Sequence, residues 1–163
     1  MEEKLKYIEN EISALGMQIT SDQAEKLLVY YGLLVEWNEK MNLTAITDFE
    51  AVVKKHFVDS LSIIYVKNMD DVDNLIDIGT GAGFPGIPLK IMFPHLKVTL
   101  LDSLRKRIDF LNHVVERLDL CELETVHGRA EDFAKPGVKR EKYDLCVSRA
   151  GADLAVRSEQ SLP

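Results

Sequence analysis

The densest chemical signal in the chain is a group of four glycines within eight residues, at positions 79, 81, 83 and 86. The group directly follows the apolar run Leu75–Ile78, which is typical of a strand buried on both faces. Pro85 lies where a helix can begin. A strand, a glycine turn and a helix N-terminus bring backbone N–H groups and the positive end of a helix dipole to one point. Because glycine lets a ligand approach the backbone closely, the segment predicts a binding corner for a nucleotide-like cofactor.

Two acidic residues help to choose between two cofactor classes. The glycines at 81, 83 and 86 fit the dinucleotide fingerprint G-x-G-x-x-G, which keeps a nicotinamide-dependent oxidoreductase as the alternative. Asp77 lies two residues before the first glycine, where a carboxylate would repel a pyrophosphate and suit a cationic aminoacyl group. S-adenosyl-L-methionine has such a group and carries no phosphate. Asp102 ends the next predicted strand, where it can accept both hydroxyls of a ribose or simply cap a helix. We therefore expect S-adenosyl-L-methionine as the cofactor.

Two further polar segments follow predicted strands. The segment Gly128–Phe133 can contact the edge of an adenine ring through backbone N–H groups and carboxylates. A helix cap with surface acids is the simpler interpretation. Arg149 is the only charge at the tip of the strand 143–147, where its planar guanidinium can grip a cofactor carboxylate or a substrate phosphate. The alternative for Arg149 is an ion pair with an acid such as Asp77. Because ligands bind at the carboxyl ends of parallel strands, we expect these loops to converge on one rim.

The elements that position these residues alternate between strand and helix from Leu75 onward, which predicts right-handed crossovers and a parallel sheet. The expected elements are strands at 75–78, 97–101, 122–127 and 143–147, helices at 85–93 and 104–118, and a final helical segment from Ala152.

Helical periodicity dominates the first part of the chain. The expected helices are residues 3–15, a second from the capping box Thr20/Gln23 to Lys40, and a third from the capping box Thr47/Glu50 through Val66. The polar stretch 67–74 is the expected linker. It would separate an N-terminal helical cap, residues 1–70, from a Rossmann-like domain, residues 71–163.

Composition limits the class of protein. A chain of 163 residues with 46% hydrophobic content is enough for one core and a small appendage. No 18-residue apolar run or signal peptide is present, so we expect a cytoplasmic protein with no membrane association. Cys121 and Cys146 are expected to be buried free thiols, and four scattered histidines predict no metal site. The net charge of −7 is a weak argument against a protein that coats nucleic acids, because such proteins tend to be basic. Composition does not determine the binding partner.

Six blocks of the sequence resemble the glucose-inhibited division protein B family. They are Trp37-Asn38, Asn42–Thr44, His56–Leu61, Asp77–Gly86, Gly128–Glu131 and Ser148–Ala150, so the resemblance covers nearly the whole chain from Leu33 onward. The family comprises bacterial enzymes that methylate N7 of a guanine in small-subunit (16S) ribosomal RNA with S-adenosyl-L-methionine.

The resemblance implies a class I methyltransferase sheet of Rossmann-like α/β type with an N-terminal helical cap. It implies small-subunit ribosomal RNA or a 30S particle as the partner of a cytoplasmic chain, which we expect to be a monomer. It also implies cofactor contacts, which are Gly79, Phe84, Ala130, Glu131 and Arg149, beside Gly81 of the same glycine turn and Asp102.

Members of the family continue for several dozen residues past a segment like Ser158–Pro163. We therefore expect a C-terminally incomplete sheet with an open edge beside the strand 143–147. A shortened form that binds cofactor or ribosome without turnover remains a further alternative.

The implied reaction needs little acid–base chemistry. Guanine N7 already carries a lone pair, so positioning is most of the task and no catalytic residue is predicted. Candidate substrate contacts are Asn42, His56 and Asp59; the last two are spaced to share a hydrogen bond, and the alternative is that they join the helical cap to the core. Candidate phosphate contacts, which can equally be solvated helix faces, are Lys54, Lys55, Arg105, Lys106 and Arg107.

Overall fold

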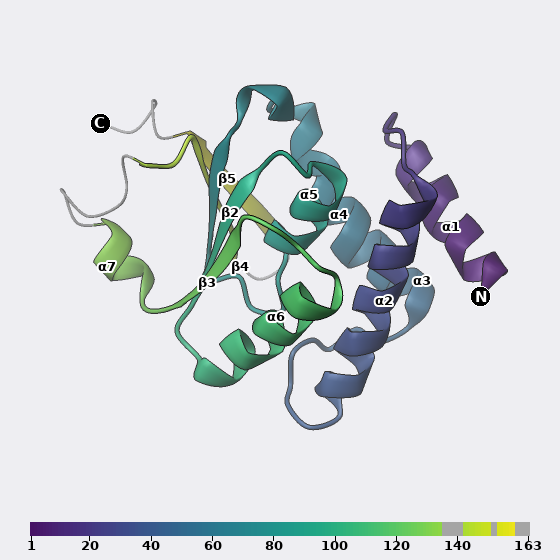
Figure 1. Cartoon of the computed structure of the whole chain (residues 1–163), viewed down its shortest axis with the longest axis horizontal. Helices are drawn as coiled ribbons and strands as arrows, with labels where there is room; N and C mark the ends of the chain where they lie inside the picture. Colours follow the sequence, from purple (N-terminus) through teal and green to yellow (C-terminus); the bar gives the residue numbers. More distant parts are fainter. Residues whose placement is uncertain (135–141, 151–152, 159–163) are drawn as a thin grey trace.

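The computed structural model describes residues 1–134, 142–150 and 153–158, and a five-stranded sheet forms its centre (Figure 1). The strands are β1 (Asn74–Ile78), β2 (Lys97–Asp102), β3 (Leu123–His127), β4 (Leu145–Ala150) and β5 (Asp153–Ser158). Their order in the sheet is β3-β2-β1-β4-β5, with the first four strands parallel and β5 antiparallel to β4. This confirms the predicted Rossmann-like α/β architecture.

Strand β5 contradicts two predictions. Residues 153–158 are not helical, and the edge of β4 is not open, because β5 pairs with β4 from Leu145↔Ser158 to Ala150↔Asp153. The predicted start of the helical segment, Ala152, lies outside the described residues. An unpaired strand edge leaves a row of N–H and C=O groups without partners. A segment that folds back as a strand satisfies these groups, whereas a helix would not.

Helices α5 (Gly86–Met92) and α6 (Arg105–Arg117) lie close to the predicted positions and pack against one face of the sheet (Figure 1). On α6 the buried side chains Ile108, Leu111 and Val114 recur every three residues, so they form one apolar stripe toward the sheet. The short helix α7 (Ala130–Ala134) follows β3. Because α5 and α6 connect parallel strands, the loops after β1 and β2 lie at the same end of the sheet.

The N-terminal helices are α1 (Glu2–Ser13) and α2 (Ser21–Asn38). The Thr20/Gln23 capping box at the start of α2 is confirmed: the Gln23 amide donates to Thr20 Oγ1 at 3.1 Å, and the Thr20 amide donates to Gln23 Oε1 at 2.9 Å. The third predicted helix is a series of short helices, namely α3 (Phe49–Val52), the π-helix η1 (Val53–Val58), α4 (Asp59–Leu61) and the 3₁₀-helix η2 (Ser62–Tyr65).

The capping box predicted at Thr47/Glu50 is wrong by one residue. Asp48 is the N-cap of α3, and its carboxylate accepts the Ala51 amide at 3.1 Å. Asp48 is itself a strong N-cap residue, so the helix begins there without a reciprocal side-chain bond. The predicted linker contains one more turn, the 3₁₀-helix η3 (Met69–Asp71).

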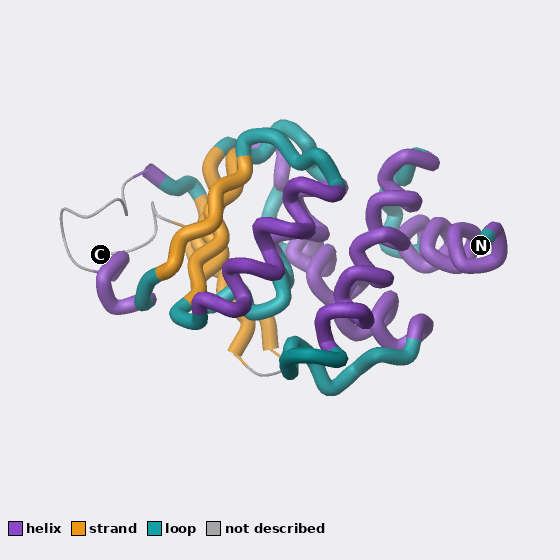
Figure 2. Tube along the Cα trace, turned by 60° about the horizontal axis from the view of Figure 1, so that its bottom comes forward, coloured by secondary structure: helices purple, strands orange, loops and turns teal. Residues whose placement is uncertain are grey.

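The N-terminal helices lie on the same side of the sheet as α5 and α6, farther out (Figure 2). Ile8 and Leu27 from these helices share one buried apolar cluster with Leu75 and Leu100 from the sheet. The side-chain amide of Gln23 also donates to the carbonyl of Ile91 in α5 at 3.2 Å. The outer helices are therefore held to the sheet domain by apolar burial and by direct hydrogen bonds.

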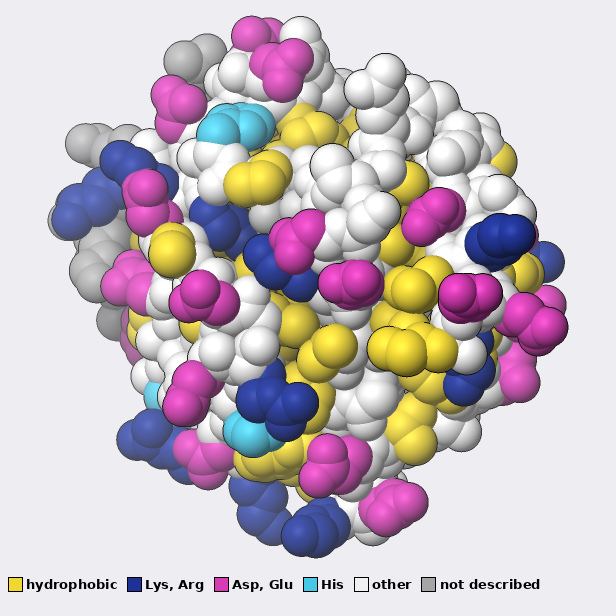
Figure 3. Space-filling model, turned by 45° about the vertical axis from the view of Figure 1, so that its right-hand side comes forward, with side chains coloured by type: hydrophobic (Ala, Val, Ile, Leu, Met, Phe, Trp, Pro, Cys, Tyr) yellow, Lys and Arg dark blue, Asp and Glu magenta, His cyan; other side chains and the backbone are white. Residues whose placement is uncertain are grey.

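The surface carries charges of both signs. Figure 3 shows Asp and Glu side chains scattered over one face, with Lys and Arg side chains among them. In the described part of the chain, no helix combines the length and the apolar character needed to cross a bilayer. Cys121 is exposed and not buried as predicted, because it lies in the tight turn between Asp119 and Glu122, two residues with positive φ.

Candidate functional site

A pocket of about 310 Å³ opens at the carboxyl ends of β1 and β4. Its walls come from five segments that are distant in the sequence: the connector after α2, the π-helix η1, the glycine turn after β1, the first turn of α6, and the tip of β4. The lining residues are Leu43, Thr44, His56, Gly79, Thr80, Gly81, Ala82, Phe84, Arg107 and Arg149. The predicted convergence of loops on this rim is therefore present for the loops after β1 and β4.

The four glycines after β1 have two different structural roles. Gly79 and Gly81 have φ of +68° and +61°, and an added Cβ at either one would meet no protein atom within 4 Å. Their backbone is thus exposed to open space beside the pocket. Gly83 and Gly86 serve packing instead: a Cβ at Gly83 would lie 2.6 Å from the Tyr30 hydroxyl, and one at Gly86 would overlap Leu100. The glycine turn is therefore open toward the pocket and closed toward the core.

Asp77 stabilises the glycine turn from inside. Its carboxylate is fully buried, and Oδ2 accepts the Thr80 hydroxyl at 2.6 Å and the Gly86 amide at 2.8 Å. Burial raises the pKa of Asp77 to about 8, although the two hydrogen bonds oppose that shift. The first N–H of α5 is thus bound to Asp77. Asp77 does not face the pocket, contrary to the prediction that it faces a cationic cofactor group.

Asp102 lies at the end of β2 behind the glycine turn. Its Oδ2 accepts the Gly81 amide at 2.8 Å, and its Oδ1 accepts the Leu104 amide at 3.0 Å, at the start of α6. Arg107 also lies 3.5 Å from Oδ1. Asp102 therefore joins the glycine turn to α6, and it lies beside the pocket and not in its wall.

Arg149 reaches across the pocket from β4 to the π-helix η1. Its Nη2 donates to the carbonyl oxygen of Lys55 at 2.7 Å, and its Nη1 lies 3.1 Å from Nδ1 of His56. Its guanidinium pairs with Asp59 at 3.4 Å, and not with Asp77 as the alternative interpretation had it. The Arg149 side chain is only 11% exposed, so this cation is held by three acceptors from one segment.

His56 lies between Arg149 and the connector after α2. Its ring stacks on Phe84, with the ring centroids 4.4 Å apart and the planes 12° apart, and its Nε2 lies 2.9 Å from Thr44 Oγ1. Burial and the neighbouring Arg149 charge lower the pKa of His56 to about 4. His56 and Asp59 both contact Arg149, and no hydrogen bond between the two is observed among the described contacts.

The structure brings together about half of the predicted site. Gly79, Gly81, Phe84, His56 and Arg149 line the pocket, and Asp59 contacts it through Arg149. Four other predicted residues do not line it: Asp102, which lies beside it, and Asn42, Ala130 and Glu131, which are exposed. Their assigned roles stay predictions.

Sequence reasoning missed two residues that organise the rim. The Asn38 side chain at the end of α2 accepts the amides of Leu43 and Thr44 at 2.8 and 3.0 Å, so it holds the connector that carries Thr44. Thr44 accepts the Ile46 amide at 3.1 Å within the connector. Its contact with His56 spans 12 residues and has no local pattern, although both residues lie in blocks that carried the family resemblance.

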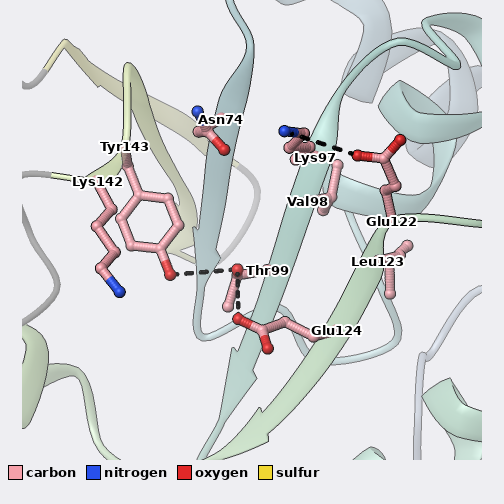
Figure 4. Close-up of a pocket in the computed structure, with 9 residues that line it drawn as sticks. All are labelled: Asn74, Lys97, Val98, Thr99, Glu122, Leu123, Glu124, Lys142 and Tyr143. Atoms are coloured by element: carbon pink, nitrogen blue, oxygen red, sulfur yellow. Dashed lines mark hydrogen bonds and ion pairs between the residues drawn. The ribbon is translucent and has the colours of Figure 1, made fainter.

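A second pocket of about 490 Å³ lies at the amino ends of β1, β2 and β3 (Figure 4). Tyr143 donates to Thr99 Oγ1, and Thr99 donates to Glu124, both at 3.2 Å. Lys97 pairs with Glu122 at 3.9 Å. The polar groups of this pocket thus bond to their immediate neighbours.

The carboxyl-end pocket suits S-adenosyl-L-methionine in three respects. Its volume is at the lower end of the range of about 300–1,000 Å³ common for small-molecule sites. Its floor contains glycine backbone where a Cβ would occupy free space, and its wall contains two guanidinium groups, Arg107 and Arg149, that can bind a carboxylate.

A glycine turn after the first strand of a parallel α/β sheet, with an acid at the end of the next strand, defines a Rossmann-like protein with a nucleotide-type pocket. A family model described as rRNA small subunit methyltransferase G matches residues 23–163, and the chain belongs to this family, GidB.

Relatives agree with this assignment. The "Ribosomal RNA small subunit methyltransferase G" of Lachnoclostridium phytofermentans is 53% identical over 93% of this chain and 63% of its own length. The protein of that name from Alkaliphilus metalliredigens is 51% identical over 100% of this chain and 68% of its own length. The chain thus spans about two thirds of the length of these relatives.

A solved precorrin-6y C5,15-methyltransferase from Geobacter metallireducens is 16% identical, with a TM-score of 0.42 over 68% of this chain and 66% of that one.

Proposed function

We propose that the protein transfers a methyl group from S-adenosyl-L-methionine to N7 of a guanine in small-subunit (16S) ribosomal RNA. The observation that carries the proposal is the pocket at the carboxyl ends of β1 and β4 in a chain of the GidB family. The partner is this RNA or the 30S particle, and the protein acts as a monomer in the cytoplasm. The N-terminal helical cap, residues 1–70, and the sheet domain, residues 71–163, form the two sides of the site.

In this proposal the residues of the chain bind and orient, and none of them transfers a proton. Bound S-adenosyl-L-methionine supplies an electrophilic methyl group on a positively charged sulfur. Arg149 and Arg107 bind the cofactor carboxylate, since both guanidinium groups line the pocket. Oδ2 of Asp102 accepts only the Gly81 amide and retains a lone pair with which it can accept a ribose hydroxyl, whereas Oδ1 contacts both the Leu104 amide and Arg107.

The other predicted contacts complete the proposed site. Ala130 and Glu131 at the start of α7 contact the edge of the cofactor adenine. Asn42, in the connector after α2, contacts the guanine. Arg105 and Lys106, both exposed at the start of α6, contact RNA phosphates. Such contacts contribute affinity in every sequence context, whereas the pocket determines which atom reacts.

The decisive experiment measures methyl transfer. The protein extended to the full length of its relatives is incubated with tritiated S-adenosyl-L-methionine and ribosomal RNA or 30S particles from a strain that lacks the native enzyme. The expected result is label in the small-subunit RNA at N7 of a guanine, and absence of label from both substrates would contradict the proposal. Calorimetric titration of the 163-residue chain with NAD and with S-adenosyl-L-methionine tests the oxidoreductase alternative, because only the correct cofactor gives heat.

A form that binds without turnover is the second candidate for the 163-residue chain itself. The chain spans 63% and 68% of the two relatives. Cofactor affinity equal to that of the full-length protein, together with no methyl transfer, would support this candidate. Methyl transfer by the 163-residue chain would exclude it.

A further inference from the structure

A chain of hydrogen bonds links the end of α2 to β4. The Asn38 side chain accepts the Thr44 amide at 3.0 Å. The Thr44 hydroxyl lies 2.9 Å from Nε2 of His56, and Nδ1 of His56 lies 3.1 Å from Nη1 of Arg149. Arg149 lies 93 residues after His56, so this chain of contacts joins the outer helices to the sheet at the pocket.

The contact with Arg149 determines the protonation form of His56. A guanidinium has only donors, so Nδ1 of His56 must accept and the imidazole must be neutral. The single ring proton is then on Nε2, where it is donated to Thr44 Oγ1. The groups that face the ring agree with the neutral form: Arg149 is a cation that disfavours imidazolium, and burial does the same, whereas Asp59 is bound to the far side of the guanidinium.

The ring of Phe84 supports both partners. It stacks on His56, and the central guanidinium carbon of Arg149 lies 5.8 Å from its centroid. Lys55 and Asp59 bind the other side of the guanidinium from the same helical segment. With Nη1 fixed by His56, Arg149 has one orientation in which every one of these contacts is made.

We propose that neutral His56, with its proton on Nε2 directed to Thr44, is a positioning residue that orients Arg149 toward the cofactor carboxylate. His56 had been a candidate substrate contact, and this assignment gives it a role that acts through Arg149. The inference rests on the proposed function, because that function supplies the carboxylate. Nη1 carries a second proton that His56 does not use, and the His56 contact fixes its direction, so loss of His56 weakens carboxylate binding while both guanidinium groups remain.

The test combines imidazole NMR with cofactor titration. In two-bond ¹⁵N–¹H spectra at pH 7, the His56 signals, assigned by their loss in His56→Phe, are expected to show the Nε2–H tautomer. Observation of the Nδ1–H tautomer, or of imidazolium, would overturn the proposal. The spectrum does not depend on cofactor, so a chain that binds no S-adenosyl-L-methionine contradicts the proposed function while the His56–Arg149 contact is still tested.

Four variants test the positioning role. His56→Phe retains a ring that can stack on Phe84, and it is expected to weaken S-adenosyl-L-methionine binding about tenfold. Thr44→Val removes the acceptor for Nε2 and is expected to weaken binding about threefold to tenfold, whereas Thr44→Ser restores it to within about twofold. Thr47→Val is the matched control in the same connector, since the Thr47 side chain is exposed.

Unchanged affinity in both His56→Phe and Thr44→Val would overturn the proposal. If His56→Phe fails to fold, Thr44→Val with its serine rescue still decides the question. Equal losses in Thr44→Val and Thr44→Ser would assign Thr44 to packing and would also count against the hydrogen-bond chain.

Discussion

The two ends of the parallel sheet differ in how their polar groups are partnered. At the amino end, Lys97 pairs with Glu122, the residue before β3, and both side chains are more than half exposed. At the carboxyl end, Arg149 is nearly buried and its partners lie 90 or more residues earlier in the chain. The amino-end pocket is the larger one, about 490 Å³ against 310 Å³ (Figure 4).

The larger volume is therefore not at the end of the sheet that we propose binds the cofactor. What distinguishes the carboxyl end is that its loops come from several elements and that its cation is fixed by contacts made before any ligand arrives. Pre-organisation of this kind lowers the cost of binding, because less side-chain freedom is lost. Matched substitutions at the two ends put the comparison to the test, and four follow in order of decreasing expected effect.

The largest effect is expected for Arg149→Met. Because the variant removes the cation and leaves His56 and Asp59 without their partner, S-adenosyl-L-methionine affinity should fall about 100-fold, or roughly 3 kcal/mol. Lys97→Met at the amino end is the control and should leave affinity unchanged. Isothermal titration of both variants provides the measurement. Equal effects of the two variants would remove the distinction between the two ends.

Gly86→Ala should lower the free energy of unfolding by about 1–3 kcal/mol, since the new methyl group would overlap Leu100 and approach Asp77. Gly32→Ala is the control: its Cβ would meet no atom within 4 Å in the exposed face of α2, so the substitution should stabilise the chain by about 0.5–1 kcal/mol. Urea unfolding measures both variants. A neutral Gly86→Ala would show that the glycine turn adjusts without strain.

Asp77→Asn should make the chain more stable at pH 8 by about 1–2 kcal/mol. The native pKa of Asp77 is raised to about 8, so between about pH 4 and pH 8 the native state holds more protons than the unfolded state. Stability therefore decreases as pH rises through this window, and Asn removes that dependence. The gain should shrink toward pH 5 in thermal unfolding followed across the range.

Glu124→Gln at the amino-end pocket is the matched control for Asp77→Asn. Its carboxylate is exposed, so the free energy of unfolding should change by less than about 0.5 kcal/mol. A gain for Asp77→Asn that is the same at pH 5 and pH 8 would contradict a raised pKa for Asp77.

Asp102→Asn is expected to give the smallest of the four effects, a loss of cofactor affinity of about fivefold to tenfold, because a charged acceptor for the ribose becomes neutral. Glu122→Gln at the amino end should bind as the unmodified chain does. Normal binding by Asp102→Asn would contradict a ribose contact at Asp102, all the more because the Asn amide nitrogen cannot accept from Gly81 or Leu104.

Local patterns predicted the four parallel strands, the glycine turn and the start of α2, but not the antiparallel strand β5. The run before Gly79 and the pair Thr20/Gln23 succeed because each depends on residues within four positions of one another. The start of α3 was wrong because Asp48 and Thr47 are adjacent cap residues of similar strength.

The partners of the site could not be read from the sequence in the same way. Arg149 binds Lys55, His56 and Asp59, and no periodicity encodes a contact across 90 or more residues. The orientation of Asp77 into the core depends on Thr80 and on how α5 packs, and neither is a property of the strand pattern. The family blocks identified these residues as a group without indicating that they meet.

The antiparallel pairing of β5 has a consequence for association. Among the described strands, β4 is an interior strand, and the sheet margins are β3 and β5. A second chain that added itself to the sheet would therefore dock on a margin, and the main-chain groups of the strand that bears Arg149 would not be available to it. Self-assembly through strand addition and occupancy of the pocket would then be independent events.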